Sequence, residues 1–119
     1  MTHTPPQILF VCRQNACRSQ MAEAFARRDA HGPIRVWSAG SASSGVIDPK
    51  AVTVMREEGV DLARHQSEGL TQLPRVTWDV VVTLGCEQGC PTVAARHHMS
   101  WDIPDPSGRP LAFYRQVRD

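Results

Sequence analysis

The sequence lacks long apolar runs, a sizeable net charge and any repeat or low-complexity segment. No stretch approaches the roughly 18 apolar residues of a membrane-spanning helix, so no membrane partner is predicted. The formal net charge of +1 gives no reason to expect a nucleic-acid partner. The first residues, MTHTPPQ, lack the basic and apolar pattern of a signal peptide. We therefore expect a cytoplasmic protein.

Cysteine is scarce, and the chain has only four, namely Cys12, Cys17, Cys86 and Cys90. In a small secreted protein, four cysteines would suggest two structural disulfides. In a cytoplasmic protein thiols stay reduced, and catalytic, redox or metal-binding roles are more common. The four cysteines therefore direct attention to chemistry rather than to structural cross-links.

The apolar pattern predicts one α/β domain over residues 1–119. Short apolar runs without alternation, typical of strands buried on both faces, alternate with segments of helical periodicity. The predicted strands cover 8–11, 34–39, 79–84 and 100–103, and the predicted helices cover 19–30, 49–59 and 111–119. This order predicts a three-layer sandwich in which helices flank a four-stranded parallel sheet.

The predicted sheet places several chemical groups at one rim. Ligands of parallel sheets bind at the carboxyl ends of the strands. Cys12, Cys86 and Asp105 each follow a predicted strand, so we expect all three at that rim. Residues 85–98 are predicted to be irregular. Three tryptophans lie in or beside predicted strands, and core packing is the default expectation for Trp37, Trp78 and Trp101.

The segment ILFVCRQNACRS joins the first predicted strand to the first predicted helix. Backbone N–H groups of such a loop, together with the helix dipole, form a nest for a tetrahedral oxyanion. The guanidinium of Arg18 can grip two oxygens of that anion. The same field stabilises a thiolate at Cys12, to which Ser19 can donate a hydrogen bond, and Ser19 can also cap the helix. The predicted oxyanion-binding residues are Arg13, Gln14, Asn15, Ala16, Cys17, Arg18 and Ser19. A small buried cysteine beside a surface arginine is the plain structural alternative.

Five segments, in this order, resemble the low-molecular-weight protein tyrosine phosphatase family and, within it, the arsenate reductases. They are VCRQNACRSQMAEAF, VWSAGS, HQSEGL, VVVTLGCEQGCP and WDIPDP, and together they extend over nearly the whole chain. The resemblance implies that Cys12 is the nucleophile and that Arg18 binds the oxyanion and stabilises the transition state. It also implies that Asn15 holds the shape of the loop and that Cys17 is structural.

The resemblance further implies a general acid at Asp105, in the late Asp-Pro pair. When Cys12 displaces an oxygen from the oxyanion, that oxygen must gain a proton, which a carboxylic acid at the mouth of the site can supply. An ordinary turn at Asp105 is the structural alternative, and Asp102 is a nearby competitor for the role.

The late cysteines separate two branches of the family. Phosphatases hydrolyse the cysteine adduct with water and tend to carry a proline where this chain has Gln20. Arsenate reductases use a second thiol, and this chain has Cys86 and Cys90 after the third predicted strand. The resemblance therefore implies an arsenate reductase with a Cys12, Cys86, Cys90 disulfide relay, and a phosphatase is the alternative. A redox or metal-responsive binding protein without turnover is a third hypothesis.

The resemblance also implies partners. The expected substrate is arsenate, with phosphate or sulfate as mimics, and an external thiol must reduce the final disulfide. The gap between Cys86 and Cys90 is only three residues, a spacing that the resemblance links to mycothiol. Thioredoxin is nevertheless the first expectation, because three usable cysteines allow a complete relay within the chain, and mycothiol is the alternative. A potassium ion held by Asn15, Glu23 and Ser38 is a further expectation, and no tightly bound cofactor is expected.

Two features fit the family pattern less well. The last helix is short or truncated, because PLAFYRQVRD supplies only its first turns where family members have a full helix. A zinc site at Cys86 and Cys90 with His97 and His98 is a weaker alternative to the relay, because no second closely spaced cysteine pair completes a zinc pattern.

Overall fold

Strands and helices alternate along the chain as predicted. The computed structural model describes residues 5–12, 17–30, 32, 34–40, 45–62, 69, 78–85, 95–104, 106 and 108–119. Within them the elements are β1 (Gln7–Cys12), α1 (Arg18–Asp29), β2 (Arg35–Gly40), α2 (Pro49–Arg56), β3 (Trp78–Leu84), β4 (Ala95–Trp101) and α3 (Leu111–Arg118).

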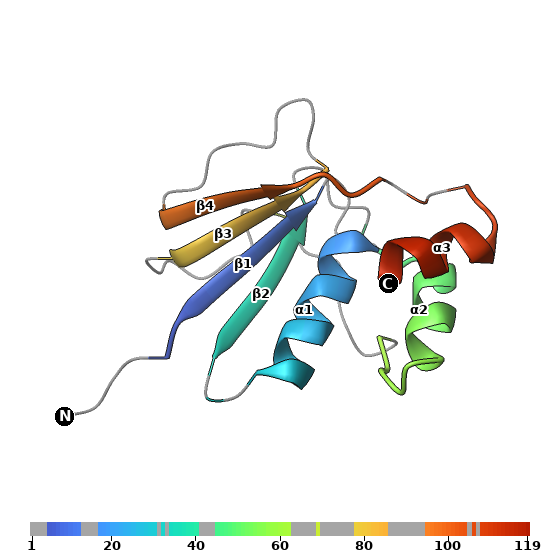
Figure 1. The fold of residues 1–119 in the computed structure, drawn as a ribbon, viewed down its shortest axis with the longest axis horizontal. Coiled ribbons are helices and arrows are strands. Elements are labelled where there is room, and N and C mark those ends of the chain that lie inside the picture. Colours follow the sequence, from blue (N-terminus) through green and yellow to red (C-terminus); the bar gives the residue numbers. More distant parts are fainter. Residues whose placement is uncertain are drawn as a thin grey trace.

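The strands form one four-stranded sheet in the order β2-β1-β3-β4. Every pairing is parallel: Ile8 of β1 lies opposite Val36 of β2 and Val80 of β3, and Val82 of β3 lies opposite Met99 of β4. The predicted α/β fold with a four-stranded parallel sheet is confirmed. All four strands therefore end at the same edge, which Figure 1 shows next to the start of α1.

Helix α1 lies between the sheet and the pair of helices α2 and α3 (Figure 1). On its sheet side, Ala22 and Ala26 pack against a cluster that includes Phe10 and Val82. On its other side, a second cluster joins α1 to α2 and α3. The buried members of that second cluster are Cys17, Met21, Ala24, Ala51, Val54, Met55, Leu62 and Tyr114. Because both sides of α1 are packed, its N-terminus is held firmly against the end of β1.

Two polar contacts join α2 to α3. The hydroxyl of the buried Tyr114 donates a hydrogen bond to the carboxylate of Asp48, which also accepts the backbone N–H of Lys50 at the start of α2. At the other end of α2, Glu57 forms ion pairs of 2.8 Å with both Arg115 and Arg118. The hydrogen bond from Arg115 and the neighbouring Arg118 lower the pKa of Glu57 to about 2.

The fourth strand is longer than predicted. It begins at Ala95, not at Ser100, so the expectation of irregular structure over residues 85–98 is wrong for its last four residues. β4 lies at one edge of the sheet, and every residue of it after Ala95 is exposed. Trp101 accordingly has 39% of its surface exposed, and the expectation of full core packing is wrong for this tryptophan, whereas Trp78 is buried.

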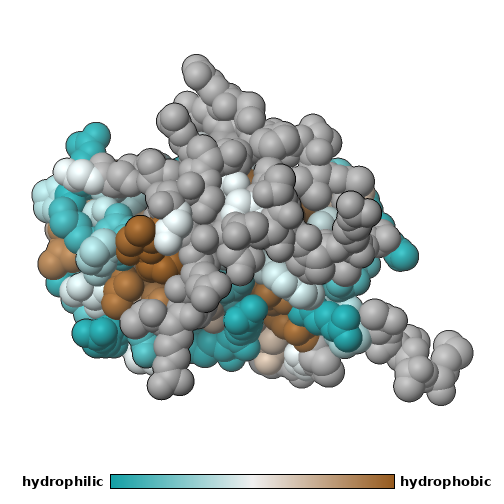
Figure 2. Space-filling model, turned by 180° about the vertical axis from the view of Figure 1, so that it is seen from behind, coloured by the Kyte–Doolittle hydropathy of each residue, from teal (hydrophilic) through white to brown (hydrophobic). Residues whose placement is uncertain are grey.

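The second helix is shorter than predicted. It ends at Arg56, and the predicted exit at Gly59 is a turn in which that glycine has a φ of 76°. On the face seen in Figure 2, hydrophilic residues surround small groups of hydrophobic ones. Among the described residues, no helix has the length and apolar character needed to cross a membrane.

Candidate active site

Cys12 is the last residue of β1, and its side chain is buried with 2% of its surface exposed. It packs in the cluster between the sheet and α1, with Phe10 and Leu84. The helix that begins at Arg18 is oriented with its N-terminus toward this end of the sheet (Figure 1). The thiol therefore lies where the helix dipole favours negative charge.

Ser19 contacts the thiol directly. Its Oγ lies 3.0 Å from Cys12 Sγ, and either atom can be the donor. Ser19 is fully buried in the first turn of α1 and does not cap it, because Cys17 occupies the N-cap position without a side-chain cap bond. The predicted capping role of Ser19 is therefore wrong, and its predicted contact with Cys12 is present. Cys17 is buried in the helix cluster, as expected for a structural residue.

Arg18 is buried beside the same helix terminus, with 7% of its surface exposed. Its Nη1 donates a hydrogen bond of 3.0 Å to the backbone carbonyl of Ile103, which follows β4. The guanidinium thus joins the start of α1 to the carboxyl ends of the last two strands. Sequence analysis missed this contact because Arg18 and Ile103 lie 85 residues apart and the acceptor is a backbone atom.

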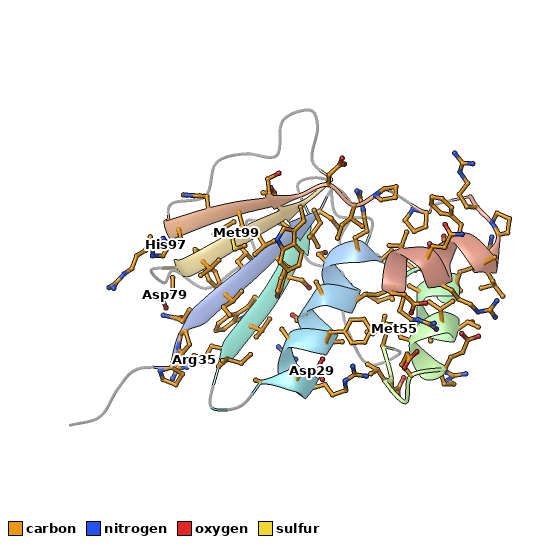
Figure 3. All side chains as sticks on the ribbon, viewed as in Figure 1. Asp29, Arg35, Met55, Asp79, His97 and Met99 are labelled. Carbon is orange, nitrogen blue, oxygen red and sulfur yellow. The ribbon has the colours of Figure 1, made fainter. Side chains whose placement is uncertain are left out.

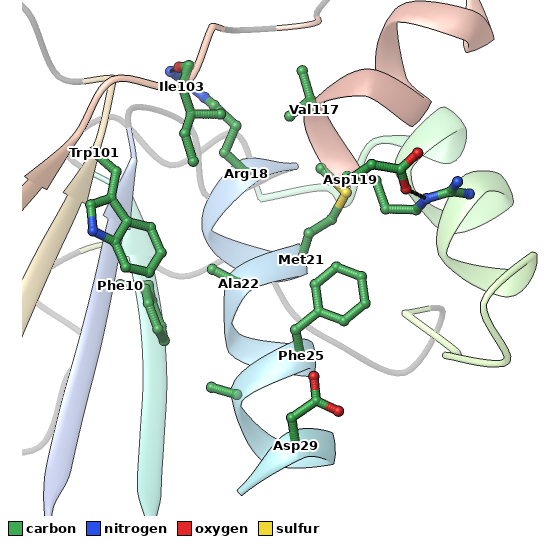
Figure 4. Close-up of a pocket in the computed structure, with 12 residues that line it drawn as sticks. Phe10, Arg18, Met21, Ala22, Phe25, Asp29, Trp101, Ile103, Val117 and Asp119 are labelled. Carbon is green, nitrogen blue, oxygen red and sulfur yellow. Dashed lines mark hydrogen bonds and ion pairs between the residues drawn. The ribbon is translucent and has the colours of Figure 1, made fainter.

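An apolar cavity of about 380 Å³ opens next to Arg18. Figure 4 shows it between Phe10 and Trp101 on the sheet side and Met21 and Phe25 on α1. Cys12 is not among its lining residues, so this cavity and the environment of the thiol share Arg18 but not the nucleophile. The buried guanidinium of Arg18 therefore borders a mostly apolar cavity on one side.

Seven predicted site residues lie outside the described part of the chain. These are Arg13, Gln14, Asn15 and Ala16 of the predicted oxyanion loop, the two late cysteines Cys86 and Cys90, and the predicted acid Asp105. Their neighbours in sequence are described: Gly85 ends the segment before Cys86, and Pro104 precedes Asp105. Gly85 donates its backbone N–H to the carbonyl of Trp101. The segment that leads to Cys86 therefore lies beside the segment that leads to Asp105.

The predicted potassium and zinc sites can each be compared with the described residues. For potassium, Glu23 and Ser38 are both buried, and Glu23 lies 3.7 Å from Arg27. For zinc, His97 and His98 pair with Val80 and Val81, toward the start of β3, and Figure 3 shows His97 far from the end of the strand. Among the described residues, no group of three His, Cys, Asp or Glu side chains is placed to hold a metal ion.

Fold and site together define a class of protein. It is the class of parallel α/β domains that place a buried cysteine at the end of the first strand, facing the N-terminus of the following helix. The model of the low molecular weight phosphotyrosine protein phosphatase family matches residues 7–119, and the chain belongs to this family.

Similar proteins include several arsenate reductases. The chain is 38% identical over 115 residues to the glutaredoxin arsenate reductase of Synechocystis sp., covering 94% of this chain and 87% of that protein. It is 36% identical over 121 residues to an arsenate reductase of Staphylococcus aureus, covering 98% of this chain and 90% of that protein. Two solved structures show the same fold. An arsenate reductase in its phosphate-binding state is 37% identical with a TM-score of 0.84, covering 95% of this chain and 88% of that one. The thioredoxin-dependent arsenate reductase of Corynebacterium glutamicum is 27% identical with a TM-score of 0.74, covering 99% of this chain and 59% of that one.

Proposed function

We propose that this chain is an arsenate reductase that converts arsenate to arsenite and so serves arsenic detoxification. The observation that carries the proposal is the buried Cys12 thiol, 3.0 Å from Ser19 Oγ and at the N-terminus that also holds the buried Arg18. Similarity to arsenate reductases over most of the chain supports it. The two cysteines that follow β3 in the sequence supply the additional thiols that the reaction needs.

In the first step the Cys12 thiolate attacks the arsenic atom of arsenate. A sulfur–arsenic bond forms, an arsenic–oxygen bond breaks, and the leaving oxygen takes a proton from Asp105 to depart as water. Arg18 and the backbone N–H groups of residues 13–19 stabilise the negative charge on the remaining oxygens. Phosphate and sulfate have the same tetrahedral shape and charge, so they compete for this site.

In the second step a thiol replaces water as the attacking group. The Cys86 thiolate attacks the sulfur of Cys12, the sulfur–arsenic bond breaks, and its electron pair stays on arsenic, which leaves as arsenite. Cys90 then attacks Cys86, which frees Cys12 and leaves a Cys86–Cys90 disulfide. The first of these transfers oxidises Cys12 and Cys86 to a disulfide and supplies the two electrons gained by arsenic, and the second exchanges that disulfide for another.

An external thiol must reduce the Cys86–Cys90 disulfide before the next turnover. We infer that thioredoxin is this reductant, with mycothiol as the alternative, because three cysteines allow the whole relay to stay within the chain. The names of the similar proteins refer to different reductants: one is a glutaredoxin arsenate reductase and another a thioredoxin-dependent arsenate reductase. A relay of this kind requires a reducing compartment, and we assign it to the cytoplasm.

A potassium ion remains part of the proposal. Asn15, Glu23 and Ser38 would hold it through oxygen atoms, which are the ligands that such a hard cation prefers. The burial of Glu23 and Ser38 is compatible with this role. The ion would stabilise the carboxylate of Glu23 inside the protein and take no part in bond breaking.

The direct test measures arsenate-dependent NADPH consumption by the purified chain supplied with thioredoxin and thioredoxin reductase. We expect turnover that requires arsenate, the chain and thioredoxin, and that disappears in Cys12→Ser. Replacing thioredoxin with a mycothiol or glutaredoxin system identifies the reductant. Hydrolysis of a small aryl phosphate, without arsenate reduction in any of these systems, would instead place the chain among the phosphatases. Stoichiometric arsenite or metal binding without turnover of either oxyanion would favour a binding protein.

A further inference from the structure

Gly85, the residue before Cys86, has its bare α-carbon against the guanidinium of Arg18. A β-carbon at Gly85 would overlap Arg18 Nη1 and the backbone carbonyl oxygen of Ile103. Gly85 also has a φ of 66°, which a residue with a side chain rarely adopts. Gly45, Gly59 and Gly108 share a positive φ but have no atom within 4 Å of the corresponding position. The close approach to Arg18 is thus specific to Gly85 among the described glycines of positive φ.

One carbonyl group holds this arrangement together. The backbone carbonyl of Trp101 accepts the N–H of Gly85 at 2.9 Å and the N–H of Ile103 at 3.1 Å. The carbonyl of Ile103 in turn accepts Nη1 of Arg18 at 3.0 Å. The end of β3 and the segment after β4 therefore form a socket of backbone atoms around the guanidinium, which we call the arginine socket: Gly85, Trp101 and Ile103.

We propose that Gly85 is a positioning residue for oxyanion binding, because its missing side chain lets the arginine socket fix the guanidinium of Arg18. A guanidinium that contacts an anion must be held in a particular plane, since its N–H groups form a rigid fork. Nη1 is held by the Ile103 carbonyl, and Nη1 and Cζ also lie against Gly85, so the two contacts together restrict the plane of the group. A methyl group at position 85 would occupy the place of Nη1 and turn the fork away from that plane.

The arginine socket lies close in sequence to the proposed second thiol and the proposed acid. Gly85 directly precedes Cys86, and Ile103 lies two residues before Asp105. The group that binds the oxyanion is therefore oriented by the two segments that carry the proposed second thiol and the proposed acid. This inference rests on the proposed function in one respect, namely that Arg18 binds the oxyanion.

The experiment measures inorganic phosphate binding by isothermal titration calorimetry, which needs no reductant and no arsenate. The variants are Gly85→Ala and, as a control, Gly59→Ala, which places a side chain at an equally positive φ of 76° in open space at the end of α2. We expect Gly85→Ala to bind phosphate about tenfold or more weakly, the scale of a lost hydrogen bond between charged groups. Gly59→Ala should bind phosphate like the unmodified chain.

A double-variant cycle separates positioning from general damage. Lysine at position 18 has no fork and no Nη1 atom, so Gly85→Ala should weaken phosphate binding much less in the Arg18→Lys background. Arg18→Lys removes one of the two overlaps of the β-carbon, so the double variant should be more stable to urea than Gly85→Ala, although the Ile103 carbonyl oxygen still opposes that carbon. Unchanged phosphate affinity in Gly85→Ala, equal losses in both backgrounds, or, where Gly85→Ala does not fold, a double variant that is no more stable than it would each overturn the inference. Absence of phosphate binding by the unmodified chain would overturn the proposed oxyanion site and this inference with it.

Discussion

The hydroxyl oxygen of Ser19 lies 3.0 Å from the sulfur of Cys12, and both side chains are buried where β1 meets α1. The strand supplies the thiol and the first turn of the helix supplies the hydroxyl. A hydroxyl at this distance can donate to a thiolate, whereas it gains less from a neutral thiol. The contact therefore places a hydroxyl group at the sulfur that the proposed mechanism uses as its nucleophile.

We predict that Ser19→Ala slows the reaction of Cys12 with iodoacetamide at neutral pH by roughly tenfold, because a charge-assisted hydrogen bond is lost. Mass spectrometry of the alkylated peptides distinguishes Cys12 from the other cysteines. Thr53→Ala is the control, since the Thr53 hydroxyl bonds the Pro49 carbonyl within α2. An unchanged rate in Ser19→Ala would show that the contact does not support the thiolate.

The central strands could be predicted from the sequence because burial dictates their composition. The predicted ranges 8–11, 34–39 and 79–84 each fall within a residue of β1, β2 and β3 at both ends. All three strands contain buried residues on both faces of the sheet, such as Leu9 and Phe10 of β1. A continuous apolar run is the direct consequence of that position.

The fourth strand and the arginine socket could not be predicted in the same way. Most of β4 is exposed, so it carries no apolar pattern, and backbone pairing with β3 alone extends it back to Ala95. The bond from Arg18 to Ile103 depends on a carbonyl group, which every residue has. The sequence shows a glycine directly before Cys86. The structure explains this glycine, because a side chain at position 85 would overlap the guanidinium of Arg18.

We predict that Glu57→Gln destabilises the chain at neutral pH and not near pH 2. The pKa of Glu57 is lowered to about 2, first by the hydrogen bond from Arg115. A carboxyl group with a depressed folded-state pKa contributes stability above its ordinary pKa of 4.5 and loses it as the pH falls toward 2. The difference in urea midpoint between the two proteins should therefore shrink between pH 4.5 and pH 2.

Salt gives an independent check of the Glu57 contacts. These ion pairs lie at the surface, so added salt should reduce the difference between Glu57→Gln and the unmodified chain at neutral pH. Glu58→Gln is the matched control, because Glu58 lies 3.5 Å from Arg118, farther than the 2.8 Å that separates Glu57 from both Arg115 and Arg118. A pH-independent difference in the Glu57→Gln variant would contradict the assignment.

We predict that Tyr114→Phe lowers the free energy of unfolding by about 1 kcal/mol, measured by urea denaturation. The ring keeps its place in the helix cluster, and the hydrogen bond to Asp48 is lost. In an Asp48→Asn background, Tyr114→Phe should lower the free energy of unfolding by a smaller amount, because the acceptor of the hydrogen bond is then uncharged. Equal costs in the two backgrounds would mean that the hydroxyl acts through another contact.

We predict that Cys86→Ser and Cys90→Ser stop arsenate reduction at different stages. Without the Cys86 thiol nothing displaces arsenic from Cys12, so no arsenite should form. Hydrolysis of a small aryl phosphate should persist, because it needs only Cys12, Arg18 and Asp105. Without the Cys90 thiol, one equivalent of arsenite should form and a Cys12–Cys86 disulfide should accumulate.

Alkylation of the remaining thiols followed by peptide mass spectrometry identifies each trapped disulfide. The matched control is Cys17→Ser, since its backbone N–H, the group proposed to contact the oxyanion, is kept, and its side chain lies in the helix cluster and has no step in the relay. Sustained thioredoxin-dependent turnover in Cys86→Ser would disprove the relay. A Cys90→Ser variant that turns over repeatedly would mean that the external thiol attacks the first disulfide directly. In that case Cys90 would be dispensable, and a small thiol such as mycothiol would be the better assignment for the reductant.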